Sequence, residues 1–510
     1  MAAPRRMKGE MPMAAVPETR RVLMIGLDSL DFDYARSHIE SLPNLRRLFE
    51  EGAVKLLDSP ANVMSASVWP TFYTGTLPGE HGQYFPMQWD PTTMRLRHVA
   101  SDWIDCEPFW RPLARQGLPV TTLDVQAAFP SRTAAGTEIV NWGVEAFGGY
   151  HCNQPELGRE IARRFGTNVL GPDVPVDKSP GRLGEIRRKL LAATKKRGEL
   201  ARWLLANTRW SLFVAVFPEC HRAGHYFWRD PDEVTSSDSD DALLEAHRAV
   251  DREVGALVEA VDLRETSLVV FSLLGMGAQH SQMHLVPPVI DRINAAFAAN
   301  AGNAAPGRPR RERRVVRLLR ERLPARLQER VALAVPEPVR DWVTSHAYAG
   351  ALDWRRTPGF PLPTGGEGYV RLNIQGRESR GSLPRGGALH RRYLDAVREG
   401  FLSLRDGATN ETLVDAVHFP AEHFPGPRSD RLPDVAISWR GGAPSTAVRS
   451  DRLGEFTGRL KTGRGGNHRA AAFAAIAGPA AKTSRVSSLA TIIDLAGLVR
   501  DLAIRSDFAT

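Results

Sequence analysis

Short runs of apolar residues alternate along this chain with longer segments in which apolar residues recur at helical spacing. Such runs are typical of strands buried in a parallel sheet, and the alternation indicates repeated strand–helix–strand units. The pattern therefore predicts an α/β fold with a doubly wound, mostly parallel sheet, flanked by helices and carrying inserted helical segments. We expect strands at 22–27, 54–57, 118–125 and 210–217, a strand and turn at 267–277, and helices at 69–73, 155–207, 240–261 and 487–499.

The composition divides the chain into four parts. The polar start predicts a disordered tail at 1–20, and core segments are expected at 21–298 and 341–510. Between them, 299–340 is Arg-rich with helical periodicity, which predicts an inserted helical segment. We interpret its basic stretch, 306–339, as a solvated helix packed on the core. Contact with a membrane surface, contact with nucleic acid, and a cap over the functional crevice are the alternatives.

The charge of the chain favours anionic partners. Its 510 residues carry a formal net charge of +9 and a sequence pI of about 9.7, which suits phosphoesters, nucleic acid or acidic lipid without choosing among them. Cys106, Cys152 and Cys220 have no paired spacing, which indicates a reducing compartment rather than a disulfide framework. No apolar run has the length of a membrane span, and the start lacks the apolar segment of a signal peptide. We therefore expect a cytoplasmic protein.

Polar side chains follow two of the predicted strands. Asp28 comes directly after 22–27, at the strand end where open α/β sheets bind ligands. Ser65 lies between the strand at 54–57 and the helix at 69–73. We expect the two to face one crevice, as a carboxylate suited to a metal and a hydroxyl near a helix start. A lone residue of either kind is more often a helix cap.

Histidines follow another predicted strand. His221 and His225 are four positions apart and share one face if their segment is helical. Neutral imidazoles suit zinc and related divalent ions, although such a pair is equally consistent with one buried histidine and one that faces solvent. His468 lies in a distant Gly-rich loop before a strand of small residues. His280 and His284 have the same spacing and are interpreted as loop or surface residues.

Three segments, in this order, carry a family resemblance: IGLDSL at 25–30, LPNLRRLFEEGAV at 42–54 and SASVWPTFYTGTLPGEHG at 65–82. With them the chain resembles the type I phosphodiesterase/nucleotide pyrophosphatase family of the alkaline phosphatase superfamily, from position 21 to about 502. A later segment, GEGYVRLNIQGRE at 366–378, is similar to a strand-and-turn signature of bacterial members.

The resemblance implies roles for the candidate residues. In that family the strand-end Asp binds a metal, and a Ser or Thr before the helix is the covalent nucleophile. Ungapped alignment places the nucleophile at Ser65, and a shifted register would place it at Ser67. The resemblance further implies that His221, His225 and His468 bind one divalent metal, most consistent with Zn²⁺, and that Asp28 and Ser65 bind a second.

The chain departs from the family pattern at several ligand positions. Leu273 and Leu274 stand where the family has the Asp and His of a Ser-Asp-His-Gly-Met motif, which bind the second metal. Leucine cannot coordinate a metal, so we expect the second site to be weak or absent. Val68 replaces an Asn that holds a phosphoryl oxygen in many members. His221 replaces the usual acid, and Glu219 is a candidate to compensate.

The function implied by the resemblance is metal-dependent hydrolysis of an anionic small-molecule phosphoester through a phosphoseryl intermediate. A diester is favoured over a monoester. One alternative is a weakened or inactive family member that binds an anionic ligand without turning it over, which the pair of leucines supports. Another is a hydrolase of sulfate or phosphonate esters.

Overall fold

The computed structural model describes residues 21–99, 103, 106–130, 135–143, 149–171, 178–228, 238–300, 335, 339, 345 and 352–504. The predicted tail at 1–20 and nearly all of the predicted insertion at 299–340 lie outside these residues. In the part of the chain that is described, no helix combines the length and the apolarity that a bilayer crossing needs. Cys106, Cys152 and Cys220 are all unpaired thiols.

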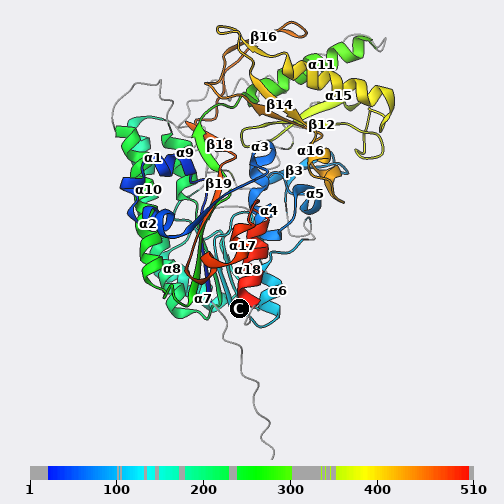
Figure 1. Cartoon of the computed structure of the whole chain (residues 1–510). Coiled ribbons are helices and arrows are strands. Elements are labelled where there is room, and N and C mark those ends of the chain that lie inside the picture. The colour runs from blue at the N-terminus through cyan, green and yellow to red at the C-terminus, as the bar shows by residue number, and fades with distance from the viewer. Residues whose placement is uncertain are drawn as a thin grey trace, which may run out of the picture.

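An eight-stranded sheet forms the centre of the main lobe (Figure 1), in the order β2–β19–β9–β1–β8–β5–β6–β7. The strands from β9 to β6 are parallel, and the two edges of the sheet are antiparallel. This arrangement confirms the predicted α/β fold with a mostly parallel sheet. The strands are β1 (Arg21–Leu27), β2 (Ala53–Leu57), β5 (Val120–Leu123), β6 (Thr137–Val140), β7 (His151–Cys152), β8 (Leu212–Phe217), β9 (Thr266–Ser272) and β19 (Ala472–Ala477).

Helices cover both faces of this sheet, which is why its central strands are apolar on both sides. All six residues of β8 are buried, as are all seven of β9. One apolar cluster packs α4 (Val68–Thr74), α6 (Trp110–Arg115), α17 (Ser484–Ser487) and α18 (Asp494–Ile504) against one face. A second cluster packs α1 (Phe32–Ser37), α2 (Pro43–Glu51), α7 (Pro155–Phe165), α8 (Pro180–Asn207) and α10 (Asp238–Glu259) against the other.

The helical segment predicted at 155–207 is two helices. Helix α7 ends where Gly166 adopts φ 73°, a left-handed conformation that favours glycine, and α8 begins with Pro180 in its first turn. The helix predicted at 487–499 instead begins at Asp494, whose carboxylate accepts hydrogen bonds from the amides of Ala490 and Thr491. Both differences come from backbone signals that apolar periodicity does not carry.

A second, smaller lobe lies beyond the ends of the main strands (Figure 1). It is built on an antiparallel four-stranded sheet with its own apolar core, so the segment predicted as a second part of one core includes a separate layer. Its elements are β11 (Gly359–Leu362), β12 (Gly368–Leu372), β14 (Val414–His418), β15 (Val435–Trp439), α11 (Val286–Asn300) and α15 (Gly387–Leu402), joined by β13 (Arg405–Asp406), β16 (Ala447–Ser450) and β17 (Gly454–Thr457).

Short elements fill the region where the lobes meet. Two of them, β10 and β18, pair antiparallel and lead back into the main sheet. The short elements of this region are β3 (Met87–Asp90), β4 (Arg95–His98), β10 (Gly275–Ala278), β18 (Gly466–Arg469), α3 (Ala61–Met64), α5 (Pro78–His81), α9 (Glu219–Phe227) and α16 (Pro420–His423).

Candidate metal and nucleophile site

Three histidines from two elements converge at the carboxyl end of the main sheet. His221 and His225 lie on α9, which follows β8 directly, and His468 lies on β18. Close packing of the two elements needs glycine, because a Cβ on Gly466 would lie 2.3 Å from the carbonyl oxygen of Gly224. The structure thus places the two predicted helix histidines and the distant loop histidine together.

The Nε2 atoms of these histidines face one another. His221 Nε2 lies 2.8 Å from His225 Nε2 and 3.2 Å from His468 Nε2. Nitrogens bound tetrahedrally to one zinc ion at about 2.0–2.1 Å would be about 3.3 Å apart. In the described part of the chain, these three residues are the one group of at least three His, Cys, Asp or Glu side chains close enough to share an ion.

The opposite ring nitrogens fix the tautomers of two of these rings. His225 Nδ1 lies 3.0 Å from the carbonyl oxygen of Gly466 and His221 Nδ1 lies 2.8 Å from Asp28 Oδ2, so each Nδ1 carries the proton and donates it. Burial lowers the pKa of His225 well below its usual range, so that ring is neutral. Its Nε2 lone pair therefore points at the other rings. The Nε2 lone pairs of His221 and His225 repel each other unless a proton or a cation lies between them. The donor set fits a divalent metal ion.

Asp28 reaches this site as the partner of His221. Its side chain is 3% exposed, its Oδ2 accepts from His221, and its Oδ1 accepts from Trp69 Nε1 at 3.0 Å. A carboxylate behind a histidine ligand holds the ring in place and raises its basicity. The geometry gives Asp28 this orienting role, and its role as a metal ligand stays a prediction.

Ser65 is the serine that faces the histidines. Its Oγ lies 3.1 Å from His468 Nδ1, and its side chain is buried beside the helix α4. Ser67, the alternative, donates its hydroxyl to the carbonyl oxygen of Met64 at 2.7 Å and is fully buried. Of the two registers, the ungapped one therefore points to the hydroxyl that contacts the site.

The suggestion that Glu219 replaces a missing metal ligand is wrong. Its Oε1 accepts from Arg197 Nε at 2.8 Å, and Arg197 Nη1 also donates to Asp124 Oδ2 at 2.6 Å. All three side chains are buried. Burial raises the pKa of Glu219, and the charge of Arg197 opposes that shift. Glu219 is therefore committed to a buried ion pair beneath α9 and is not available to a metal.

The two leucines at the family's ligand positions belong to the apolar core. Leu273 and Leu274 are 0% and 2% exposed and pack in the same cluster as Trp69 and Phe271. Their carbonyl oxygens accept hydrogen bonds from the hydroxyls of Ser59 and Ser272. The wall of the site at these positions is apolar and offers no side-chain ligand.

The other predicted histidine pair takes no part in the site. His280 Nδ1 lies 3.1 Å from the carbonyl oxygen of Ala278, and His284 Nε2 lies 3.0 Å from that of Ser445. These backbone contacts are consistent with their interpretation as loop residues.

Sequence reasoning missed Glu367, a charged residue at the site. It comes from the second lobe, just before β12, and its Oε1 accepts the amide N–H of Ser65 at 2.8 Å. The signal that could have found it is the segment at 366–378, which resembles a family signature and begins with this residue's neighbour.

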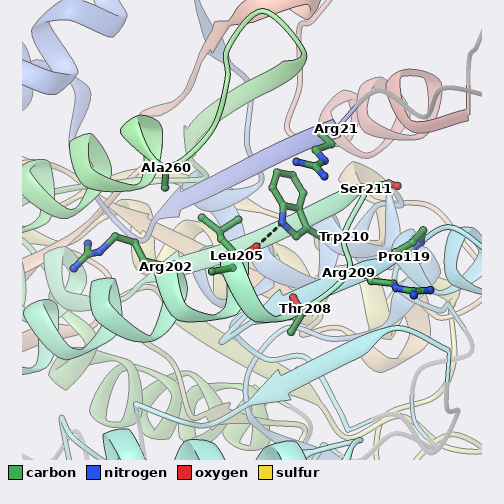
Figure 2. A pocket seen from close by; sticks show the side chains of 10 residues that line it. Arg21, Pro119, Arg202, Leu205, Thr208, Arg209, Trp210, Ser211 and Ala260 are labelled. Atoms are coloured by element: carbon green, nitrogen blue, oxygen red, sulfur yellow. Dashed lines mark hydrogen bonds between the residues drawn. The ribbon is translucent and has the colours of Figure 1, made fainter.

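A separate pocket of about 480 Å³ lies at the opposite end of the main strands (Figure 2). It opens where β1 and β8 begin, whereas Asp28 follows the end of β1. There Arg21 lies over the ring of Trp210 at 5.1 Å, and Trp210 Nε1 donates to the carbonyl oxygen of Leu205. Its lining residues include the hydroxyls of Thr208 and Ser211 but no His, Cys, Asp or Glu side chain that could hold a metal.

The fold and the site together define a class. An α/β fold with a mostly parallel central sheet flanked by helices is alkaline-phosphatase-like, as the family resemblance implied. The sequence model of the type I phosphodiesterase/nucleotide pyrophosphatase family matches residues 22–383, and the chain belongs to this family. Metal dependence is typical of its members. Among curated proteins, none matches the chain.

Solved structures are similar to this one at low sequence identity. Phosphonoacetate hydrolase from Sinorhizobium meliloti in complex with phosphonoformate matches with a TM-score of 0.50 and 14% identity, over 96% of this chain and 97% of that one. Murine ectonucleotide pyrophosphatase/phosphodiesterase 5 matches with a TM-score of 0.47 and 12% identity, over 96% and 97% of the two chains. The first similarity confirms the alkaline-phosphatase-like fold and nothing finer.

Proposed function

We propose that the protein hydrolyses a phosphoester, with Ser65 as the nucleophile and His221, His225 and His468 holding one divalent metal, for which Zn²⁺ is the best fit. Family membership supports the reaction class. The observation that carries the assignment is the contact of 3.1 Å between Ser65 Oγ and His468 Nδ1, because it joins a buried hydroxyl to the histidine cluster.

In this mechanism the residues divide the work between attack and charge stabilisation. Ser65 Oγ loses its proton to solvent and attacks phosphorus, and the ester oxygen leaves and takes up a proton from water. A water molecule then hydrolyses the phosphoseryl intermediate, which releases phosphate and restores the serine hydroxyl. With its Nε2 facing the other histidines, His468 carries its proton on Nδ1. The Nδ1–H group donates a hydrogen bond to Ser65 Oγ, and this bond stabilises negative charge on that oxygen. A bound divalent cation would lower the pKa of the serine hydroxyl or of water and neutralise charge on phosphoryl oxygens.

A second candidate function is binding of an anionic ligand without turnover. The buried apolar side chains of Leu273 and Leu274 support it, because they remove two ligands that the family uses for a second metal. Loss of one stabilising charge contact in a transition state typically costs about a hundredfold in rate. Slow hydrolysis is therefore expected even if the first proposal holds.

The test is hydrolysis of an aryl phosphodiester, with its sulfate analogue measured in parallel. Ser65→Ala is expected to abolish turnover, whereas Ser67→Ala, the matched control two positions away, should retain it. A phosphorylated peptide trapped from the intact protein should map to Ser65. If Ser65→Ala retains the wild-type rate, the assignment of the nucleophile is wrong. Absence of hydrolysis in the intact protein together with binding of inorganic phosphate would favour the second candidate.

A further inference from the structure

The loop before β12 lies directly over the candidate nucleophile. Glu367 Oε1 accepts the amide N–H of Ser65 at 2.8 Å, and its Oε2 accepts from Thr364 Oγ1 at 3.0 Å. A Cβ on Gly365 would stand 3.6 Å from Ser65 Oγ. The second lobe therefore contributes a carboxylate to the immediate surroundings of a serine 302 positions earlier.

This position of the loop is built into the fold. The carbonyl oxygen of Gly366 accepts from Ser281 Oγ at 2.5 Å and from Trp439 Nε1 at 3.0 Å. Gly366 also packs against β18, where a Cβ would lie 2.3 Å from Asn467 Oδ1, next to His468. Contacts with β15, β18 and the loop that follows β10 thus fix the segment that carries Glu367.

Glu367 occupies the donor that a substrate would use. A phosphoryl group attacked by Ser65 Oγ places a non-bridging oxygen near the same residue's amide N–H, and donors of this kind stabilise the developing charge. Here that N–H is already bonded to a carboxylate. The neighbouring position that carries Asn in many family members is Val68, which offers no replacement donor.

We propose that Glu367 is a specificity-determining residue that selects substrates by charge, a proposal that rests on the assignment of Ser65 as nucleophile. A phosphoryl group with two negative charges is repelled about twice as strongly by this carboxylate as a group with one. The site therefore accepts monoanionic phosphoryl groups, such as those of diesters, and disfavours the dianionic groups of monoesters. Asp28, the other acid at the site, is already paired with His221.

The proposal is tested by equilibrium binding to the full-length, metal-loaded protein, without turnover. The probes are dimethyl phosphate, a monoanion, and inorganic phosphate at alkaline pH, where it is a dianion. Glu367→Gln should improve the affinity for inorganic phosphate relative to dimethyl phosphate by about tenfold, which corresponds to about 1.4 kcal/mol. Thr364→Val, which alters the same loop but keeps the charge, should leave the ratio near that of the wild type.

Each outcome separates this proposal from the assignment of the site. An unchanged ratio in Glu367→Gln, with measurable binding of both anions, would overturn charge selection alone. An equal gain in affinity for both anions would show that the Glu367 side chain only obstructs the site, and this result would also overturn charge selection. Glu367→Ala removes the same charge and should shift the ratio in the same direction if the glutamine variant fails to fold. If neither anion binds to the wild type or to any variant, both charge selection and the proposed function are contradicted.

Discussion

At the scale of single residues, His81 shows how the fold treats an imidazole that has no role in the metal site. It belongs to the PGEHG segment and is 0% exposed. Its Nδ1 accepts the amide N–H of Gln83 at 3.0 Å, and its Nε2 lies 3.1 Å from Thr71 Oγ1. Burial lowers its pKa from 6.5 to about 3, so the folded protein holds it neutral.

This shift predicts a dependence of stability on pH. Between pH 6.5 and about pH 3 the unfolded chain binds a proton at His81 and the folded protein does not, so the free energy of unfolding falls as pH is lowered. The expected loss from this residue is about 1.4 kcal/mol per pH unit. His81→Gln should flatten the curve by about that slope, measured by urea unfolding at several pH values. His423→Gln, at an exposed position, is the control. Parallel curves for wild type and His81→Gln would contradict the account.

The residues that sequence reasoning found are those with a local signal. Asp28 directly follows β1, and His221 lies in the first turn of the helix after β8; such strand ends meet at one edge of a parallel sheet. Glu367 has no such signal, because its contact with Ser65 depends on how the second lobe is placed. Which of Ser65 and Ser67 faces the histidines also depended on the turn between α3 and α4, which periodicity does not resolve.

At the scale of elements, a buried ion cluster joins α8 and α9 to the main sheet. Arg197 of α8 bonds Glu219, the first residue of α9, and Asp124, which follows β5. Asp124 also accepts the amide N–H groups of Trp142 and Gly143. The cluster fixes the start of the helix that carries His221 and His225.

Removing the cation from this cluster should be costly. Arg197→Met would leave two buried carboxylates unpaired, and breaking a buried pair in this way typically costs about 3–5 kcal/mol. The control is Lys195→Ala on the same helix, where the side chain is 75% exposed and pairs with Glu199 at 3.9 Å. That change should cost less than about 1 kcal/mol. Equal denaturation midpoints for both variants would show that the cluster does not stabilise the fold.

The sequence predicted α8 but not this role for one of its residues. Arg197 belongs to a basic stretch of α8, a pattern typical of a solvated helix face, but its side chain is fully buried. Periodicity places a residue on a helix face. It does not reveal that two acids from distant elements meet it there.

At the scale of the whole molecule, the site lies where two lobes meet. The main sheet could be predicted because its strands are continuous apolar runs buried on both faces. The second lobe was not predicted as a separate layer, because its strands have only four or five residues and its central pair joins β12 to the distant β15. Yet the second lobe supplies Glu367, so the charge around Ser65 is a property of both lobes.

The most direct test of the account is the number of metal ions bound per chain after loading with Zn²⁺ and removal of excess metal. We predict one ion, bound by three histidines, with an apolar wall at Leu273 and Leu274 in place of a second site. The variant with His221, His225 and His468 all changed to alanine should bind none, whereas His280→Ala should still bind one. Two tightly bound ions in the wild type, or an unchanged ion in the triple variant, would contradict the account.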